Sequence, residues 1–89
     1  ISGYFSHRLL GLVNEFPSVF EELRGYGLML GVKTKIQNTT FTSEAFNEKL
    51  LLAPASDNVV RILPPLNISK NEIELFINLM RKVAIRVQN

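Results

Sequence analysis

Arg61 has the side chain best suited to binding chemistry in this sequence. It lies within the apolar run at residues 59–63, between Val60 and Ile62. Because side chains alternate along a strand, Val59, Arg61 and Leu63 should share one face, with Val60 and Ile62 on the other. A guanidinium there either reaches solvent, pairs with a carboxylate of the protein, or presents its planar fork to a ligand carboxylate. The residues alone leave these three possibilities open.

The other candidates for catalysis are weak. His7 is the one histidine, in a helical region, whereas a Ser/His/acid triad needs groups that converge from separate elements. Glu21 and Glu22 are adjacent, so they would point to opposite faces of a strand and make a poor acid/base pair. With no cysteine in the chain, a disulfide, a thiol nucleophile and a Cys-based metal site are excluded. We identify no catalytic residue and no metal site.

A glycine-rich run at residues 24–31 contains Gly25, Gly27 and Gly31. It includes G-x-G, but it lacks both the helix that follows directly in a dinucleotide site and the K-[ST] ending of a phosphate loop. We interpret these glycines as allowing a bulge and close packing of the backbone against another layer.

Composition indicates one small globular domain over residues 1–89, with 46% hydrophobic and 20% charged residues. The net charge of +2 is too small to predict binding to nucleic acid, and no apolar run is long enough to span a membrane. The sequence begins at Ile1 without a methionine or a signal segment. We therefore expect a fragment of a longer chain.

The first half of the chain predicts a helix, a strand and a second helix. Apolar residues at helical spacing between positions 5 and 16 predict the first helix, which Pro17 should end. Residues 19–35 favour one buried strand with a bulge. The second helix should begin after an N-cap at Thr42, with Phe41 and Phe46 as a hydrophobic staple.

The second half predicts a short extended segment, a turn at residues 56–58, a strand at 59–63 and a last helix. A capping box of Ser69 and Glu72 marks the start of that helix. The order of these helices and strands along the chain predicts a two-layer α+β domain, with a largely antiparallel sheet of about three strands and helices on one face. The other face is either exposed or covered by a partner outside this chain.

Two segments resemble motifs of the class III pyridoxal-phosphate aminotransferases. The run R-G-Y-G-L-M-L-G-V at residues 24–32 is similar to the family's R-G-x-G-L-M-x-G-[IV]. The run D-N-V-V-R-I-L-P-P-L at residues 57–66 is similar to D-N-V-[IV]-R-x-x-P-P-L. Residues 68–73 resemble the start of the family's C-terminal helix. The resemblance covers nearly the whole chain, and within the class it is greatest to the bacterial acetylornithine and succinyldiaminopimelate aminotransferases.

This resemblance implies that the chain is the C-terminal small domain of a fold-type I enzyme, in which Arg61 binds a substrate carboxylate. The run at 24–31 would then shape domain packing. The family's large domain supplies the Schiff-base lysine and the pyridoxal-phosphate site, whose motifs this chain lacks, so the fragment alone should bind no cofactor and be inactive. Lys49 stands where the family often has glycine, which argues against a left-handed helix cap there.

The resemblance also implies a homodimeric, cytoplasmic enzyme of arginine biosynthesis. Such an enzyme transfers the terminal amino group of N-acetylornithine, or a similar ω-amino acid, to 2-oxoglutarate. Two alternatives are a stand-alone α+β module that binds RNA or protein, and a piece that uses its open sheet face for association. An RNA-recognition domain would need aromatic residues on adjacent central strands, and residues 59–63 contain none.

Overall fold

The computed structural model describes residues 2–26, 29–50, 52–62 and 67–88. The expected end of the last strand at Leu63 and Pro64 lies outside these residues, as does Gly27 of the glycine-rich run. The elements, in chain order, are α1 (Ser2–Glu15), β1 (Phe20–Tyr26), β2 (Met29–Thr34), α2 (Asn38–Asn47), β3 (Ala53–Ala55), the 3-10 turn η1 (Ser56–Asn58), β4 (Val59–Ile62) and α3 (Lys70–Val87).

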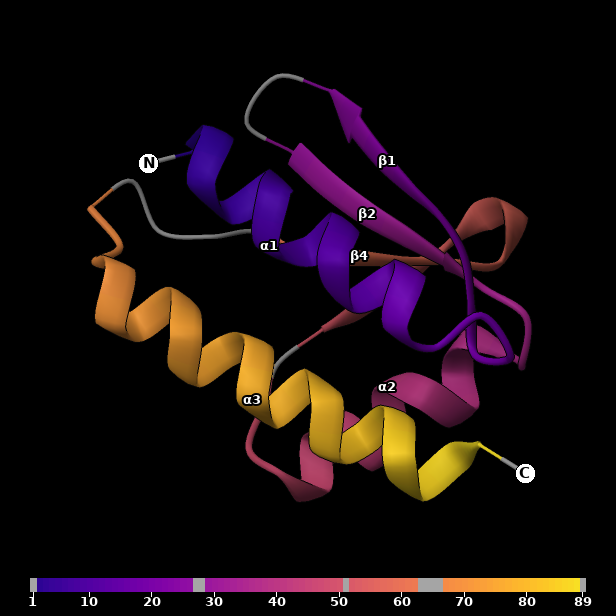
Figure 1. Ribbon diagram of the computed structural model, residues 1–89. Helices are drawn as coiled ribbons and strands as arrows, with labels where there is room; N and C mark the ends of the chain where they lie inside the picture. The colour runs from indigo at the N-terminus through magenta and orange to yellow at the C-terminus, as the bar shows by residue number, and fades with distance from the viewer. Residues whose placement is uncertain (1, 27–28, 51, 63–66, 89) are drawn as a thin grey trace.

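The strands form one sheet in the order β1-β2-β4-β3, and every neighbouring pair is antiparallel. Helix α1 packs on β1 and α3, whereas α2 packs on α3, β3 and β4. Figure 1 shows α1 and α3 side by side on one side of the sheet. The two-layer α+β prediction is confirmed, with four strands in place of about three.

The additional strand comes from residues 19–35, which form two strands and not one. Strands β1 and β2 pair from Phe20 opposite Thr34 to Tyr26 opposite Met29. A bulge does occur, but between Phe20 and Glu22, away from the glycines. The prediction of one continuous strand is therefore wrong, because a hairpin reverses the chain without a long polar loop.

Helix α2 begins at Asn38 with its N-cap at Gln37, five residues before the predicted N-cap at Thr42, so that prediction is wrong. The hydrophobic staple is also wrong, since Phe41 is fully buried while Phe46 is 60% exposed. The cause is tertiary: the side-chain amide of Asn38 donates hydrogen bonds to the carbonyls of Ala55 and Val59, 2.9 Å each. These bonds hold the first turn of α2 against the start of β4.

Helix α2 ends in a left-handed cap at Lys49, whose φ is 64°. The backbone N–H of Lys49 donates to the Phe46 carbonyl, and that of Leu50 donates to the Ala45 carbonyl. This is the Schellman pattern, and buried Leu50 and Ala45 provide its apolar contact. The argument from Lys49 against a left-handed cap is therefore wrong, because packing at Leu50 outweighs the modest cost of a positive φ.

The core lies between the sheet and the helices. Val32, Val60 and Ile62 point from the sheet into it, and Ile73, Ile77, Met80, Val83 and Ala84 point in from α3. Three edge-to-face aromatic pairs extend it: Phe5 with Phe76, Phe16 with Phe20, and Phe20 with Phe41. The predicted capping box is confirmed, because the Ser69 hydroxyl accepts from the Glu72 N–H and the Glu72 carboxylate accepts from the Ser69 N–H.

Helices α1 and α3 are also joined by polar contacts at their partly exposed edge. The Arg8 guanidinium donates two hydrogen bonds to the Glu74 carboxylate, at 2.6 and 2.8 Å, and the Tyr4 hydroxyl donates a third at 2.6 Å. Arg8, followed by Tyr4, lowers the pKa of Glu74 from 4.5 to about 2.

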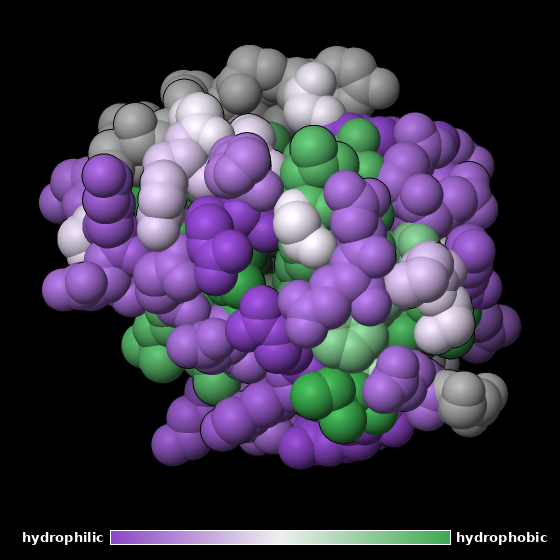
Figure 2. All heavy atoms as spheres, in the orientation of Figure 1, coloured by the Kyte–Doolittle hydropathy of each residue, from purple (hydrophilic) through white to green (hydrophobic). Residues whose placement is uncertain are grey.

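The outer surface of this helical side is mainly hydrophilic, with apolar residues in separate spots (Figure 2). Among the described residues, the large apolar side chains exposed to solvent are Leu10, Phe46, Leu75 and Ile85. Within the described ranges, the helices are too short or too polar to cross a membrane.

Ile77 and Leu75 provide a matched pair on α3, since Ile77 is fully buried and Leu75 is 60% exposed. We predict that Ile77→Ala lowers the free energy of unfolding by about 3 kcal/mol, because it leaves a cavity between α3 and the sheet. Leu75→Ala should change it by less than about 0.5 kcal/mol. Urea unfolding followed by circular dichroism measures both, and equal losses would contradict the assigned core.

The lowered pKa of Glu74 predicts a loss of stability in acid. Its ionised form is favoured by the fold, so this stabilisation is complete above about pH 4.5 and disappears as the pH falls towards 2. Glu74→Gln should therefore flatten the decline in urea midpoint over this range. A decline as steep as that of the unchanged protein would show that Glu74 is not responsible.

Candidate functional site

Four residues form one row across the open face of the sheet, opposite the helices. Strand pairing places Arg24 beside Gly31, Gly31 beside Arg61, and Arg61 beside Ala53. Arg61 is exposed, and the residues on either side of it in β4 are buried towards the helices. The predicted alternation along β4 is thus confirmed for the described residues, and it directs Arg61 away from the core.

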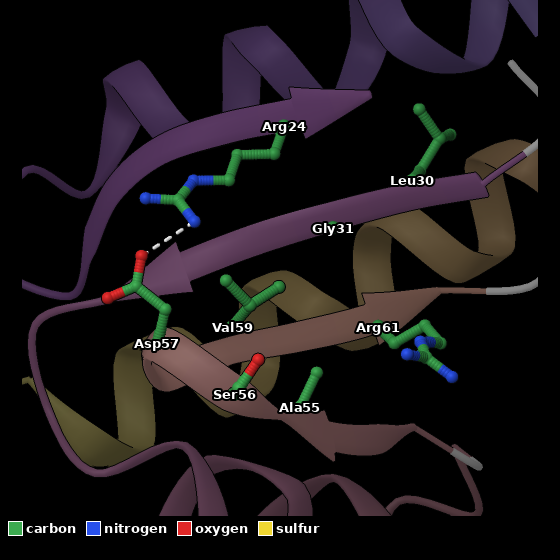
Figure 3. Close-up of a pocket in the computed structure, with 8 residues that line it drawn as sticks. All are labelled: Arg24, Leu30, Gly31, Ala55, Ser56, Asp57, Val59 and Arg61. Atoms are coloured by element: carbon green, nitrogen blue, oxygen red, sulfur yellow. Dashed lines mark ion pairs between the residues drawn. The ribbon is translucent and has the colours of Figure 1, made fainter. Parts of the chain in front are cut away.

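A hollow of about 270 Å³ lies on this face (Figure 3). It is lined by residues from β1, β2 and the segment from β3 to β4, namely Arg24, Leu30, Gly31, Ala55, Ser56, Asp57, Val59 and Arg61. The hollow therefore combines an apolar floor with three charged side chains.

Gly31 keeps the middle of the row free of a side chain. A Cβ at this position would lie 2.8 Å from Cγ1 of Val59, closer than packed carbon atoms can approach. Close packing at this glycine is therefore observed, but the contact is with a neighbouring strand of the same sheet, so the predicted contact with another layer is wrong. Ala53, on the other side of Arg61, has only a methyl side chain, so neither cross-strand neighbour crowds the guanidinium.

Asp57 forms ion pairs with two cations at one end of the hollow. Its carboxylate lies 2.7 Å from Nη1 of Arg24 and 3.0 Å from Nζ of Lys33. Lys33 also donates to the Asp57 carbonyl at 2.6 Å, and Glu22 pairs with Arg24 at 3.2 Å. Lys33, then Arg24, lowers the pKa of the Asp57 carboxyl, while Asp57, then Glu22, raises the pKa of Arg24.

Arg61 has no such partner among the residues that the structure describes, where every ion pair involves other cations. The remaining residues of the chain include no aspartate or glutamate. Figure 3 shows its guanidinium pointing away from Asp57, while that of Arg24 points towards it. Of the three charged residues that line the hollow, Arg24 and Asp57 compensate each other, which leaves one positive charge at Arg61. This arrangement suits a single carboxylate.

A pair of asparagines fixes the turn that carries Asp57. Asp57 and Asn58 both have left-handed backbones, with φ of 62° and 58°. The Asn58 side-chain amide donates to the carbonyls of Thr34 and Ile36 at 2.6 and 2.7 Å, and its oxygen accepts from the Asn38 N–H at 2.8 Å. The turn is therefore tied to the end of β2 and the start of α2, and β4 begins directly after it.

The other sequence candidates lie elsewhere. His7 is exposed on α1, and Glu21 is exposed on β1 at the bulge. Glu22 does lie on the open face, but as a partner of Arg24 and not as half of an acid/base pair. Within the described residues, no cluster of acidic or histidine side chains could hold a metal ion.

Sequence reasoning missed two residues of the hollow. Asp57 was interpreted only as a turn residue, and Arg24 only as part of a packing segment, yet they meet at 2.7 Å. An opposite-charge pair on one sheet face could have been found from the strand register, but that register requires β1 and β2 to be recognised as a hairpin.

Comparison with known protein families and sequences finds aminotransferases in each case. The family Aminotransferase class-III matches residues 1–84. The chain is 46% identical over 72 residues to acetylornithine aminotransferase 2 of Caulobacter vibrioides, covering 81% of this chain and 18% of that protein. It is 44% identical over 76 residues to acetylornithine aminotransferase of Mesorhizobium japonicum, covering 85% and 19%.

Solved structures agree with the sequence comparison. N-acetylornithine aminotransferase from Stenotrophomonas maltophilia superposes with a TM-score of 0.82 at 29% identity, over 96% of this chain and 24% of that one. An ornithine aminotransferase from Plasmodium yoelii has a TM-score of 0.84 at 19% identity, over 96% and 23%, which shows the same fold. The chain spans about a fifth of the length of the curated relatives it matches.

Asn58→Gly tests the asparagine pair without straining the turn, because glycine adopts a positive φ freely. We predict a loss of about 2 kcal/mol in unfolding free energy, since the partly buried carbonyls of Thr34 and Ile36 lose the hydrogen bonds from the Asn58 amide, and Ile36 keeps the one from the Thr34 hydroxyl. Asn47→Gly, at the exposed end of α2, is the control and should cost under about 1 kcal/mol. Urea unfolding distinguishes the two, and an Asn58→Gly loss no larger than the control's would refute the role of the asparagine pair in fixing the turn.

Proposed function

Because the chain belongs to the class III aminotransferase family, we propose that it is the C-terminal small domain of a longer aminotransferase and that Arg61 binds the substrate carboxylate. The one uncompensated charge in the hollow carries this proposal. The match to only about a fifth of each curated relative supports the assignment of residues 1–89 as one domain of that enzyme.

The geometry around Arg61 supports a role in orienting the substrate. A guanidinium and a carboxylate can form two parallel hydrogen bonds, which fix direction as well as position. The chain's own contribution to transamination is then to hold the carboxylate end of the substrate, so that its amino or oxo group faces the reacting centre. The small neighbours Gly31 and Ala53 leave room for a carboxylate beside the guanidinium.

Amino acids and 2-oxo acids are the substrate classes of this family, and both carry a carboxylate. The relatives cited above are named as acetylornithine aminotransferases. We propose that the longer enzyme transfers the terminal amino group of N-acetylornithine, or a similar ω-amino acid, to 2-oxoglutarate in arginine biosynthesis. A homodimer in the cytoplasm, acting on small molecules and not on nucleic acid or membranes, belongs to the same proposal.

Class III aminotransferases use pyridoxal phosphate, whose aldehyde is held by a lysine in the resting enzyme. The lysines of this chain do not fit that role. Lys33 is held by Asp57, Lys70 lies 5.1 Å from the centre of the Tyr4 ring, and Lys35, Lys49 and Lys82 are exposed. We therefore assign the cofactor to a part of the enzyme outside this chain, and we expect the chain alone to be inactive.

Arg61→Lys in the intact aminotransferase tests the proposal. We predict a rise of about tenfold or more in the KM for 2-oxoglutarate, because lysine keeps the charge but cannot reproduce the two parallel hydrogen bonds. Arg81→Lys is the matched control, since Arg81 lies on α3 and pairs with Glu15 away from the hollow. Steady-state kinetics measures both, and a KM unchanged by Arg61→Lys would exclude Arg61 from the substrate site.

A further inference from the structure

Three cations lie on the open face of the sheet within two adjacent rows. Arg24 and Arg61 share one row, on either side of Gly31, and Lys33 lies in the next row between Glu22 and Val59. All three could attract a carboxylate that enters the hollow. Only Arg24 and Lys33 are held by Asp57, which uses a different carboxylate oxygen for each.

The structure assigns to Asp57 the role of a specificity-determining positioning residue: it holds Arg24 and Lys33 away, so that a substrate carboxylate binds Arg61 alone. This inference rests on the proposed function of Arg61. It concerns how the site selects one binding mode among several, with Asp57 acting through Arg24 and Lys33.

The local geometry equips Asp57 for this role. Its left-handed backbone and the hydrogen bonds of neighbouring Asn58 fix the turn relative to β2. The contact of Lys33 with the Asp57 carbonyl adds a second restraint on the same residue. With the turn fixed, the carboxylate draws the Arg24 guanidinium to one end of the hollow, and Figure 3 shows Arg61 extending towards the other.

Loss of the Asp57 charge would leave Arg24 with only the longer contact to Glu22, at 3.2 Å, so that its guanidinium fork could turn into the same hollow. Arg24 lines the hollow already, so it needs only a rotation of its flexible side chain to compete for the carboxylate. A substrate held by Arg24 would be directed away from the reacting centre. The result is non-productive binding, which lowers kcat and KM by the same factor and leaves kcat/KM unchanged.

Asp57→Asn in the intact aminotransferase tests this inference, because asparagine also tolerates a positive φ and the turn is retained. At saturating amino donor, we expect kcat and KM for 2-oxoglutarate to fall together by about fivefold, with kcat/KM retained within about twofold. A merely structural role would instead lower kcat/KM.

Two further variants complete the test. Glu22→Gln removes the same charge from the same face and also pairs with Arg24, but Glu22 does not line the hollow, so kcat should stay within about twofold. Adding Arg24→Gln to Asp57→Asn removes the released guanidinium and should restore kcat. The inference is overturned if Asp57→Asn leaves kcat as little changed as Glu22→Gln does. It is also overturned if the kcat of the double variant stays as low as that of Asp57→Asn.

The outcome for Arg61→Lys separates this inference from the function on which it rests. If Arg61→Lys raises KM but Asp57→Asn leaves both constants unchanged, Arg61 binds the carboxylate and only the role of Asp57 is wrong. If Arg61→Lys leaves KM unchanged, the proposed function itself is wrong.

Discussion

The pairing register of β4 against β2 is the constraint on which the site depends. It places Arg61 opposite Gly31, with Ala53 opposite Arg61 from the other side. A shift of one residue would turn Arg61 into the core and Val60 out to solvent, because side chains alternate strictly along a strand. Burial of Val60 and Ile62 on the helical side therefore fixes the Arg61 side chain on the open face.

The two faces of the sheet have separate roles. The helical face carries the apolar packing that stabilises the domain, whereas the open face carries paired charges, a glycine and one uncompensated arginine. This division lets the open face be shaped for binding, since its residues contribute little to the core. The asparagine pair, Asn38 and Asn58, connects the two faces. The Asn58 side chain fixes the Asp57 turn by hydrogen bonds to the end of β2 and the start of α2.

Local signals in the sequence predicted what local interactions decide. The capping box at Ser69, the helix before Pro17 and the alternation around Arg61 depend on neighbours within a few residues, and all three are confirmed. The start of α2 could not be predicted, because Asn38 is held by carbonyls 17 and 21 residues away. The Arg24–Asp57 pair required the β1–β2 hairpin, and the role of Arg61 came from the family resemblance.

The most direct test of the central claim is a crystal structure of the intact aminotransferase with a dicarboxylate substrate analogue bound. The account predicts that one carboxylate accepts two parallel hydrogen bonds from the Arg61 guanidinium, while Arg24 remains on Asp57. A carboxylate bound to Arg24, or bound with no contact to Arg61, would contradict it.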